Sequence, residues 1–124
     1  GTRNLFLINS DGTGLNQVTD YWPANSEVGG WSPDDSYIFY YLHETDKPTH
    51  VIIRNMATGT EYDLTGEYPQ LSHLAWIDDI HLVITNGYDY PDLIVLAADG
   101  SDAETIYTFE SPYSNPSGLT VIPN

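Results

Sequence analysis

The stretch Asn4-Leu-Phe-Leu-Ile-Asn-Ser-Asp-Gly12 returns twice in altered form, as His50-Val-Ile-Ile-Arg-Asn-Met-Ala-Thr-Gly59 and Asp92-Leu-Ile-Val-Leu-Ala-Ala-Asp-Gly100. Each copy is a short apolar run, then two or three small or polar residues, then glycine. The three glycines stand 47 and 41 positions apart. Glycine adopts the positive φ of a tight turn without strain, so each copy predicts a strand that enters a hairpin.

A second strand is predicted after each glycine. The first two copies end alike, in Leu15-Asn-Gln-Val-Thr19 and Glu61-Tyr-Asp-Leu-Thr65, whereas the third copy, Ala103-Glu-Thr-Ile-Tyr107, has lost this ending. Upstream, Gly30-Trp-Ser-Pro-Asp-Asp35 matches Ala75-Trp-Ile-Asp-Asp79, and an apolar strand follows each. The repeated unit therefore contains four strands. Two strands precede the hairpin stretch, the hairpin stretch itself forms the third, and the strand after its glycine forms the fourth.

This unit has the length of a propeller blade, because blades of about 40 to 50 residues hold four short strands each. No window of a dozen residues shows the apolar spacing of a helix. We therefore predict an all-β fold, a β-propeller of four-stranded antiparallel blades, with about two and a half to three blades in the chain. The expected organisation is a single propeller segment, with a partial blade in residues 1–20, blades in 21–65 and 66–109, and a first strand of a further blade in 110–124, at Leu119–Ile122.

The repeat resembles a known family. Residues 4–19 and Trp31-Ser-Pro-Asp-Asp-Ser-Tyr-Ile-Phe39 resemble the repeat of TolB-type, WD40-like propellers, which runs as apolar strand, Asp-Gly, Leu-Thr, Trp-Ser-Pro-Asp-Gly, apolar strand. The resemblance covers most of the chain and weakens after residue 79. Asp35 stands where the family usually has glycine, and Ile77-Asp78 where it has Ser-Pro. The resemblance implies a propeller with a protein-interaction or ligand-docking role, and similar repeats flank the catalytic domain of prolyl-oligopeptidase-like enzymes.

About three blades leave the ring incomplete within one chain, because propellers close with four to eight. Two explanations stay open. Copies of the chain could assemble into a ring or filament, or the chain could belong to a longer propeller.

Charge narrows the range of partners. Three basic residues face eighteen acidic ones, for a net charge of -15. A basic surface is needed to bind nucleic acid or an anionic membrane, so we expect neither, and no run is apolar enough for membrane insertion. The acidity suits a soluble extracellular or periplasmic protein. The chain has no cysteine, which excludes disulfides and thiolate chemistry.

No catalytic residues are predicted. The Gly-x-Ser-x-Gly elbow of a serine hydrolase is absent from the sequence, and the four histidines show no metal-ligand spacing. His73 and His81 could meet on adjacent strands as a zinc pair, although hydrogen-bonded structural histidines are the commoner case. We expect a protein without enzymatic activity and without a required cofactor.

Calcium is a second candidate metal. Asn86, Asp89 and Asp92 offer three hard oxygen ligands in one loop, which is what a calcium site needs. The spacing matches no calcium-binding hand, and aspartates in turns usually cap their own backbone.

Aromatic residues mark the predicted binding surface, because Tyr and Trp combine a large contact area with a polar group. Tyr21, Trp22, Tyr88 and Tyr90 stand in or beside loops and are its candidates. Trp31 and Trp76 recur with the repeat and are expected in the core. Tyr40 and Tyr41 alternate along a strand, so one of the two should be buried.

The leading hypothesis is a propeller module that binds a protein partner or assembles with itself. The alternatives are an accessory propeller of a larger hydrolase or peptidase, and an extracellular module that binds carbohydrate or calcium.

Overall fold

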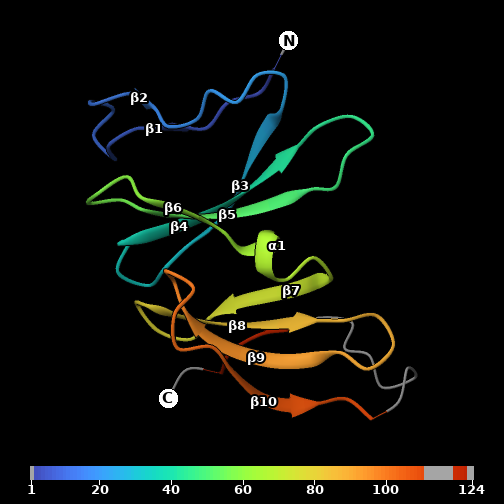
Figure 1. The fold of residues 1–124 in the computed structure, drawn as a ribbon. Coiled ribbons are helices and arrows are strands. Elements are labelled where there is room, and N and C mark those ends of the chain that lie inside the picture. Colours follow the sequence, from blue (N-terminus) through green and yellow to red (C-terminus); the bar gives the residue numbers. More distant parts are fainter. Residues whose placement is uncertain (1, 111–118, 123–124) are drawn as a thin grey trace.

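The computed structural model describes residues 2–110 and 119–122, and almost all of its regular structure is β (Figure 1). The strands form three antiparallel sheets. The N-terminal hairpin pairs β1 (Phe6–Leu7) with β2 (Asn16–Gln17). The middle sheet consists of β3 (Asn25–Trp31), β4 (Tyr37–His43), β5 (His50–Asn55) and β6 (Glu61–Asp63). The C-terminal sheet consists of β7 (Leu71–Trp76), β8 (His81–Asn86), β9 (Asp92–Ala97) and β10 (Glu104–Thr108).

The strands of each four-stranded sheet follow one another in chain order. The middle sheet lies within residues 21–65 and the C-terminal sheet within 66–109, and no sheet closes into a barrel in the described part of the chain. The short helix α1 (Leu64–Glu67) connects them, and Asp63 caps its start by accepting a hydrogen bond from the Gly66 N–H. Among the described residues, no helix has the length and apolar composition needed to cross a membrane.

Glycines form the hairpin turns as predicted. Gly12, Gly59 and Gly100 have φ values of 86°, 75° and 87°. In each turn the glycine N–H donates to the carbonyl three or four residues earlier, on Asn9, Asn55 and Ala97 respectively. Asn9, Asn55 and Ala97 therefore occupy equivalent positions in the three copies of the hairpin.

The three sheets stack in chain order, with the middle sheet between the other two (Figure 1). Alternate side chains of one strand point to opposite faces, so β4 serves both neighbours. Ile38 and Tyr40 pack toward the hairpin in one core cluster, whereas Phe39 packs toward the C-terminal sheet in the other. Tyr40 is fully buried and Tyr41 half-buried, which confirms the alternation predicted for this pair.

Trp31 corrects the prediction that both repeated tryptophans lie in the core, because it is 39% exposed. Trp76 packs against the middle sheet, with ring centroids 6.1 Å from Tyr37 and 6.5 Å from Phe39. Both of these partners belong to β4, the second strand of its sheet. The hairpin beside Trp31 has only two strands and offers no equivalent of Tyr37 and Phe39.

The predicted strand at Leu119–Ile122 is also wrong, because these residues form no strand. The remainder of that expected unit, residues 111–118 and 123–124, lies outside the described residues. An apolar run becomes a strand only when another strand pairs with it, and none pairs with this run in the described part of the chain.

Edge strands of the two large sheets are irregular or short. β3 has a bulge between Val28 and Gly30, β7 between Leu71 and His73, and β10 between Thr105 and Tyr107. The remaining edge strand, β6, has three residues.

Candidate binding surface

The connections between strands gather at two opposite ends of the sheets (Figure 1). One end, here called the aromatic end, carries residues 18–24, the β4–β5 loop, α1 and the β8–β9 loop. The other, here called the acidic end, carries the hairpin turns and the β3–β4 and β7–β8 turns. Antiparallel strands reverse direction at each turn, so connections alternate between the two ends. All four aromatic residues predicted for a binding surface belong to the aromatic end.

Tyr21 and Trp22 line a common hollow of about 260 Å³ at this end. The pairing of Asn25 with His43 holds the segment before β3 beside the β4–β5 loop, and this contact forms the hollow. Trp22 is 78% exposed. The complete lining is Tyr21, Trp22, Pro23, Ala24, Leu42, Glu44, Lys47, Pro48 and His50.

A network of polar side chains holds Tyr21 in place. Tyr21 and Tyr40 donate hydrogen bonds to the two carboxylate oxygens of Glu61, and Arg54 Nη1 lies 3.7 Å from Glu61 Oε2. Burial raises the pKa of both hydroxyls, and the bonds to Glu61 raise it further. Both tyrosines therefore stay protonated and keep donating at neutral pH. The repeat gave no sign of Glu61, because Leu15 occupies its place in the first copy.

His50 connects the hollow to α1. Its Nδ1 lies 2.8 Å from Oδ2 of Asp63, the residue that caps the helix. Burial acts to raise the pKa of Asp63, but hydrogen bonds from Thr65 and His50 outweigh it, and the pKa lies below its ordinary value. Asp63 is thus an anion at neutral pH and a firm anchor for the His50 ring.

Tyr88 and Tyr90 lie in the β8–β9 loop, 69% and 58% exposed, and do not line the hollow. The four predicted residues therefore form two pairs, one on each large sheet. Pro48 and Pro23, which complete the hollow around Trp22, were not predicted, since proline alone signals only a break in a strand.

The proposed calcium ligands are partly engaged by the protein itself. Asn86 and Asp92 face each other as the last pair between β8 and β9. The Asn86 Oδ1 accepts from the Gln70 N–H at 3.0 Å, and the Asp92 Oδ1 accepts from the Thr108 hydroxyl at 2.6 Å. No group of three or more His, Asp or Glu residues is placed to hold a metal ion within residues 2–110 and 119–122.

The two histidines considered as a zinc pair are separated. His73 lies opposite Thr85, with 3.2 Å between its Nδ1 and the hydroxyl, whereas His81 begins β8 at the other end of the pairing. The His81 Nδ1 lies 2.9 Å from Asp78 Oδ2.

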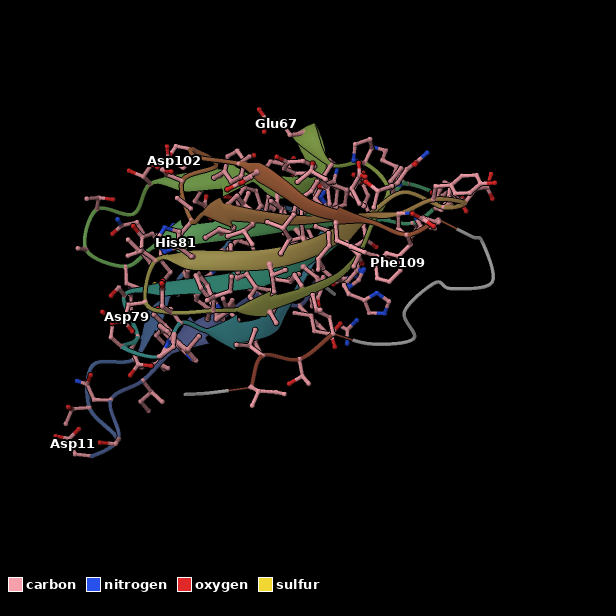
Figure 2. The ribbon with its side chains drawn as sticks, turned by 90° about the horizontal axis from the view of Figure 1, so that it is seen from below. Asp11, Glu67, Asp79, His81, Asp102 and Phe109 are labelled. Atoms are coloured by element: carbon pink, nitrogen blue, oxygen red, sulfur yellow. The ribbon has the colours of Figure 1, made fainter. Side chains whose placement is uncertain are left out.

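The acidic end carries four aspartates that cap their own turns. Each accepts a hydrogen bond from the backbone N–H two residues further on, at 2.9 to 3.0 Å, and the set is Asp11, Asp34, Asp78 and Asp99. Hydrogen bonds from those residues hold the pKa of all four carboxyls below the ordinary value. Figure 2 shows Asp11, Asp79 and Asp102 at this end and Phe109 at the other. These carboxylates serve the turns, so the aromatic end is the better candidate for a binding surface.

Comparisons of the chain with protein-family models, curated proteins and solved structures found no match.

Proposed function

We propose that this chain is a non-enzymatic binding module, built as a segment of a β-propeller, whose aromatic end docks a protein partner in an extracellular or periplasmic setting. The hollow lined by Tyr21 and Trp22 carries the proposal. A tryptophan left 78% exposed beside a tyrosine fixed by hydrogen bonds is a typical anchor of an interface.

The propeller arrangement is supported by equivalent residues that point in equivalent directions. Trp31 pairs with Ile38 and Trp76 with Leu82, which aligns β4 with β8. Ile38 packs on the hairpin before it, and Leu82 packs on the middle sheet before it. Each sheet therefore places the same strand positions against the sheet that precedes it, as stacked blades do.

The charge of the chain indicates the chemistry of the partner. The one lysine in the lining, Lys47, lies 2.8 Å from Glu44 and is neutralised by it. Against a net charge of -15, a cationic partner is attracted and an anionic one repelled. The partner surface we propose is a basic peptide segment with an apolar side chain or proline that enters the hollow.

The test is a titration with two synthetic peptides that share an apolar centre and carry either lysine and arginine or glutamate at the flanks. Calorimetry should show binding of the basic peptide, which weakens as salt is added. Trp22→Ala should weaken it by about 10-fold or more, since truncating an anchor costs roughly 2 kcal/mol. Trp31→Ala is the matched control, because Trp31 is also exposed but outside the hollow.

Equal affinity for the acidic peptide, no binding of either peptide, or unchanged affinity in Trp22→Ala would each contradict the proposal. Binding of an oligosaccharide in place of the peptides would assign the hollow to the carbohydrate alternative.

A further inference from the structure

We propose that a cleft between the middle and C-terminal sheets, at the acidic end, binds a neutral saccharide. The cleft has a volume of about 350 Å³, and the side chains that matter for binding are Tyr37, Asn55, Thr60, Tyr62 and Asp99. This site goes beyond the proposed function, because it is separate from the aromatic hollow and takes a different class of ligand.

The cleft lies where turns of two neighbouring sheets meet. The β5–β6 turn of the middle sheet and the β9–β10 turn of the C-terminal sheet are both at the acidic end (Figure 1). Ile53 and Ala98, which are 1% and 3% exposed, form its floor. Its lining thus comes from the two four-stranded sheets and the turns within them, and the N-terminal hairpin takes no part.

Two tyrosine rings line the cleft and are held in place by their neighbours. Tyr37 lies beside Trp76, with ring centroids 6.1 Å apart. The Tyr62 hydroxyl donates to Glu67 Oε2 at 2.9 Å. The end of the Tyr62 ring lies against Gly100, where a Cβ atom would come within 2.5 Å of Tyr62 Cζ. Aromatic rings that are already fixed bind a ligand without a further loss of side-chain entropy.

Several polar groups in the lining keep donors for a ligand. The Asn55 Oδ1 accepts from the Ala57 and Thr58 N–H groups at 2.9 and 3.2 Å, and its Nδ2 has no partner among the described residues. The Thr60 hydroxyl accepts from the Thr58 hydroxyl at 3.0 Å, which leaves its own proton to donate. The Tyr37 hydroxyl makes no hydrogen bond within the described part of the chain.

Asp99 adds an acceptor at the margin of the cleft. Its Oδ1 accepts from the Ser101 N–H and hydroxyl at 2.9 and 2.6 Å, and its Oδ2 has no partner among the residues that the structure describes. A sugar hydroxyl both donates and accepts, so a saccharide can use the donors and the acceptor together. Its C–H groups can pack on the two tyrosine rings.

The same groups disfavour a charged ligand. An anion is repelled by Asp99 and by the net charge of -15. An ammonium group only donates, so it would leave the donors of Asn55, Thr60 and Tyr37 without acceptors. A neutral polyhydroxylated ligand avoids both costs, and the volume, at the lower end of the range for ligand sites, suits a mono- or disaccharide.

The first test is protein-observed NMR of the isotope-labelled chain. The probes are the methyl glycosides of glucose, galactose, mannose and N-acetylglucosamine, each added up to about 50 mM, which would occupy even a site with a Kd of about 10 mM. The backbone amide signals of Thr60 and Asp99 should shift and saturate with at least one glycoside. The signals of Glu44 and Lys47, which line the aromatic hollow, should stay in place.

The second test removes a single hydroxyl from the cleft. Tyr37→Phe keeps the ring and should weaken binding of the responding glycoside by about 5- to 10-fold, the value of one hydrogen bond. Tyr41→Phe is the matched control, because Tyr41 lies on the same face of β4 and is likewise half-buried but does not line the cleft. Circular dichroism checks that both variants are folded.

Ionic strength separates this site from the hollow. Affinity for a neutral glycoside should not change as salt is added, whereas binding of the basic peptide weakens. Trp22→Ala should keep wild-type affinity for the glycoside, and Tyr37→Phe should keep wild-type affinity for the peptide. Each proposal can therefore fail without the other.

Three results would overturn the assignment of the cleft. The first is the lack of a saturating shift at Thr60 and Asp99 with all of the glycosides. The second is equal glycoside affinity in folded Tyr37→Phe and in wild type. The third is a shift of the same signals by tetramethylammonium chloride at lower concentration than by any glycoside, which would make the cleft a cation site.

Discussion

The middle and C-terminal sheets have the same strand order and the same glycine turn, yet equivalent positions in the two sheets are buried to different depths. The middle sheet packs against the hairpin on one side and the C-terminal sheet on the other, so Ile38 and Ile53 are 0% and 1% exposed. In the C-terminal sheet, Leu96 is fully buried but Val95 beside it is only half-buried. Equivalent apolar positions of the repeat are therefore buried to different depths, and this depth decides how much of each side chain's apolar surface stabilises the fold.

The largest effect we expect compares equivalent positions on the two sheets. Ile53→Ala should lower the free energy of unfolding by about 3 kcal/mol, since it opens a cavity in a closed core. Val95→Ala should cost less, about 1 kcal/mol, because the smaller Val95 side chain is only half-buried and loses less apolar burial. Denaturant unfolding at low protein concentration measures both, and equal losses would show that the sheets are equally covered.

A smaller effect is expected at the bulge of β3. A methyl group on Gly29 would overlap the Phe39 ring and approach the Phe39 carbonyl oxygen to 2.9 Å. Gly29→Ala should therefore destabilise the chain by roughly 1 to 3 kcal/mol, the usual cost of overpacking. Gly66→Ala is the control, because its nearest neighbour would be 3.7 Å away. If both variants had the same thermal midpoint, the packing of the middle sheet on Gly29 would be looser than described.

The smallest effect concerns the turn aspartates, which occur in all three sheets. Their pKa is lowered on folding, so their contribution to stability is complete above the ordinary value of 3.8 and is lost as pH falls through the lowered value. Asp34→Asn keeps the acceptor for the Ser36 N–H but cannot titrate. As pH falls from about 5 to about 2, the unfolding free energy of Asp34→Asn should therefore decrease less steeply than that of wild type. The difference between the two slopes should correspond to less than about one bound proton.

Asp34→Ala separates the two roles, since it removes the acceptor and should lower stability at neutral pH as well. A pH profile of Asp34→Asn that coincides with that of wild type would show that this carboxylate contributes nothing through titration.

Local features were predicted well from the sequence. The three hairpin glycines adopt the expected conformation because a positive φ is a property of one residue. Even Asp35, which stands where the resembled repeat has glycine, has a φ of 62°. Strand β3 is harder to recognise, because its Glu27, Gly29 and Gly30 interrupt the apolar pattern and the strand depends on pairing with β4.

Features that depend on neighbours were predicted less well. Trp31 and Trp76 look alike in sequence, but only Trp76 has Tyr37 and Phe39 beside it. Tyr21 and Trp22 could be selected by residue type alone. Glu61, which fixes Tyr21, lies 40 positions away and is brought near by the folding of the middle sheet, because Tyr21 precedes β3 and Glu61 begins β6.

The irregular edges have a consequence for how this acidic protein behaves when it is concentrated. A bulge or a length of three residues on every outer strand of the two large sheets leaves no long, flat row of free N–H and C=O groups there for a foreign strand to extend. Cross-β growth through these edges, the route to amyloid, is thereby discouraged. Contacts between molecules are directed to side chains on the sheet faces, where sequence can specify the partner.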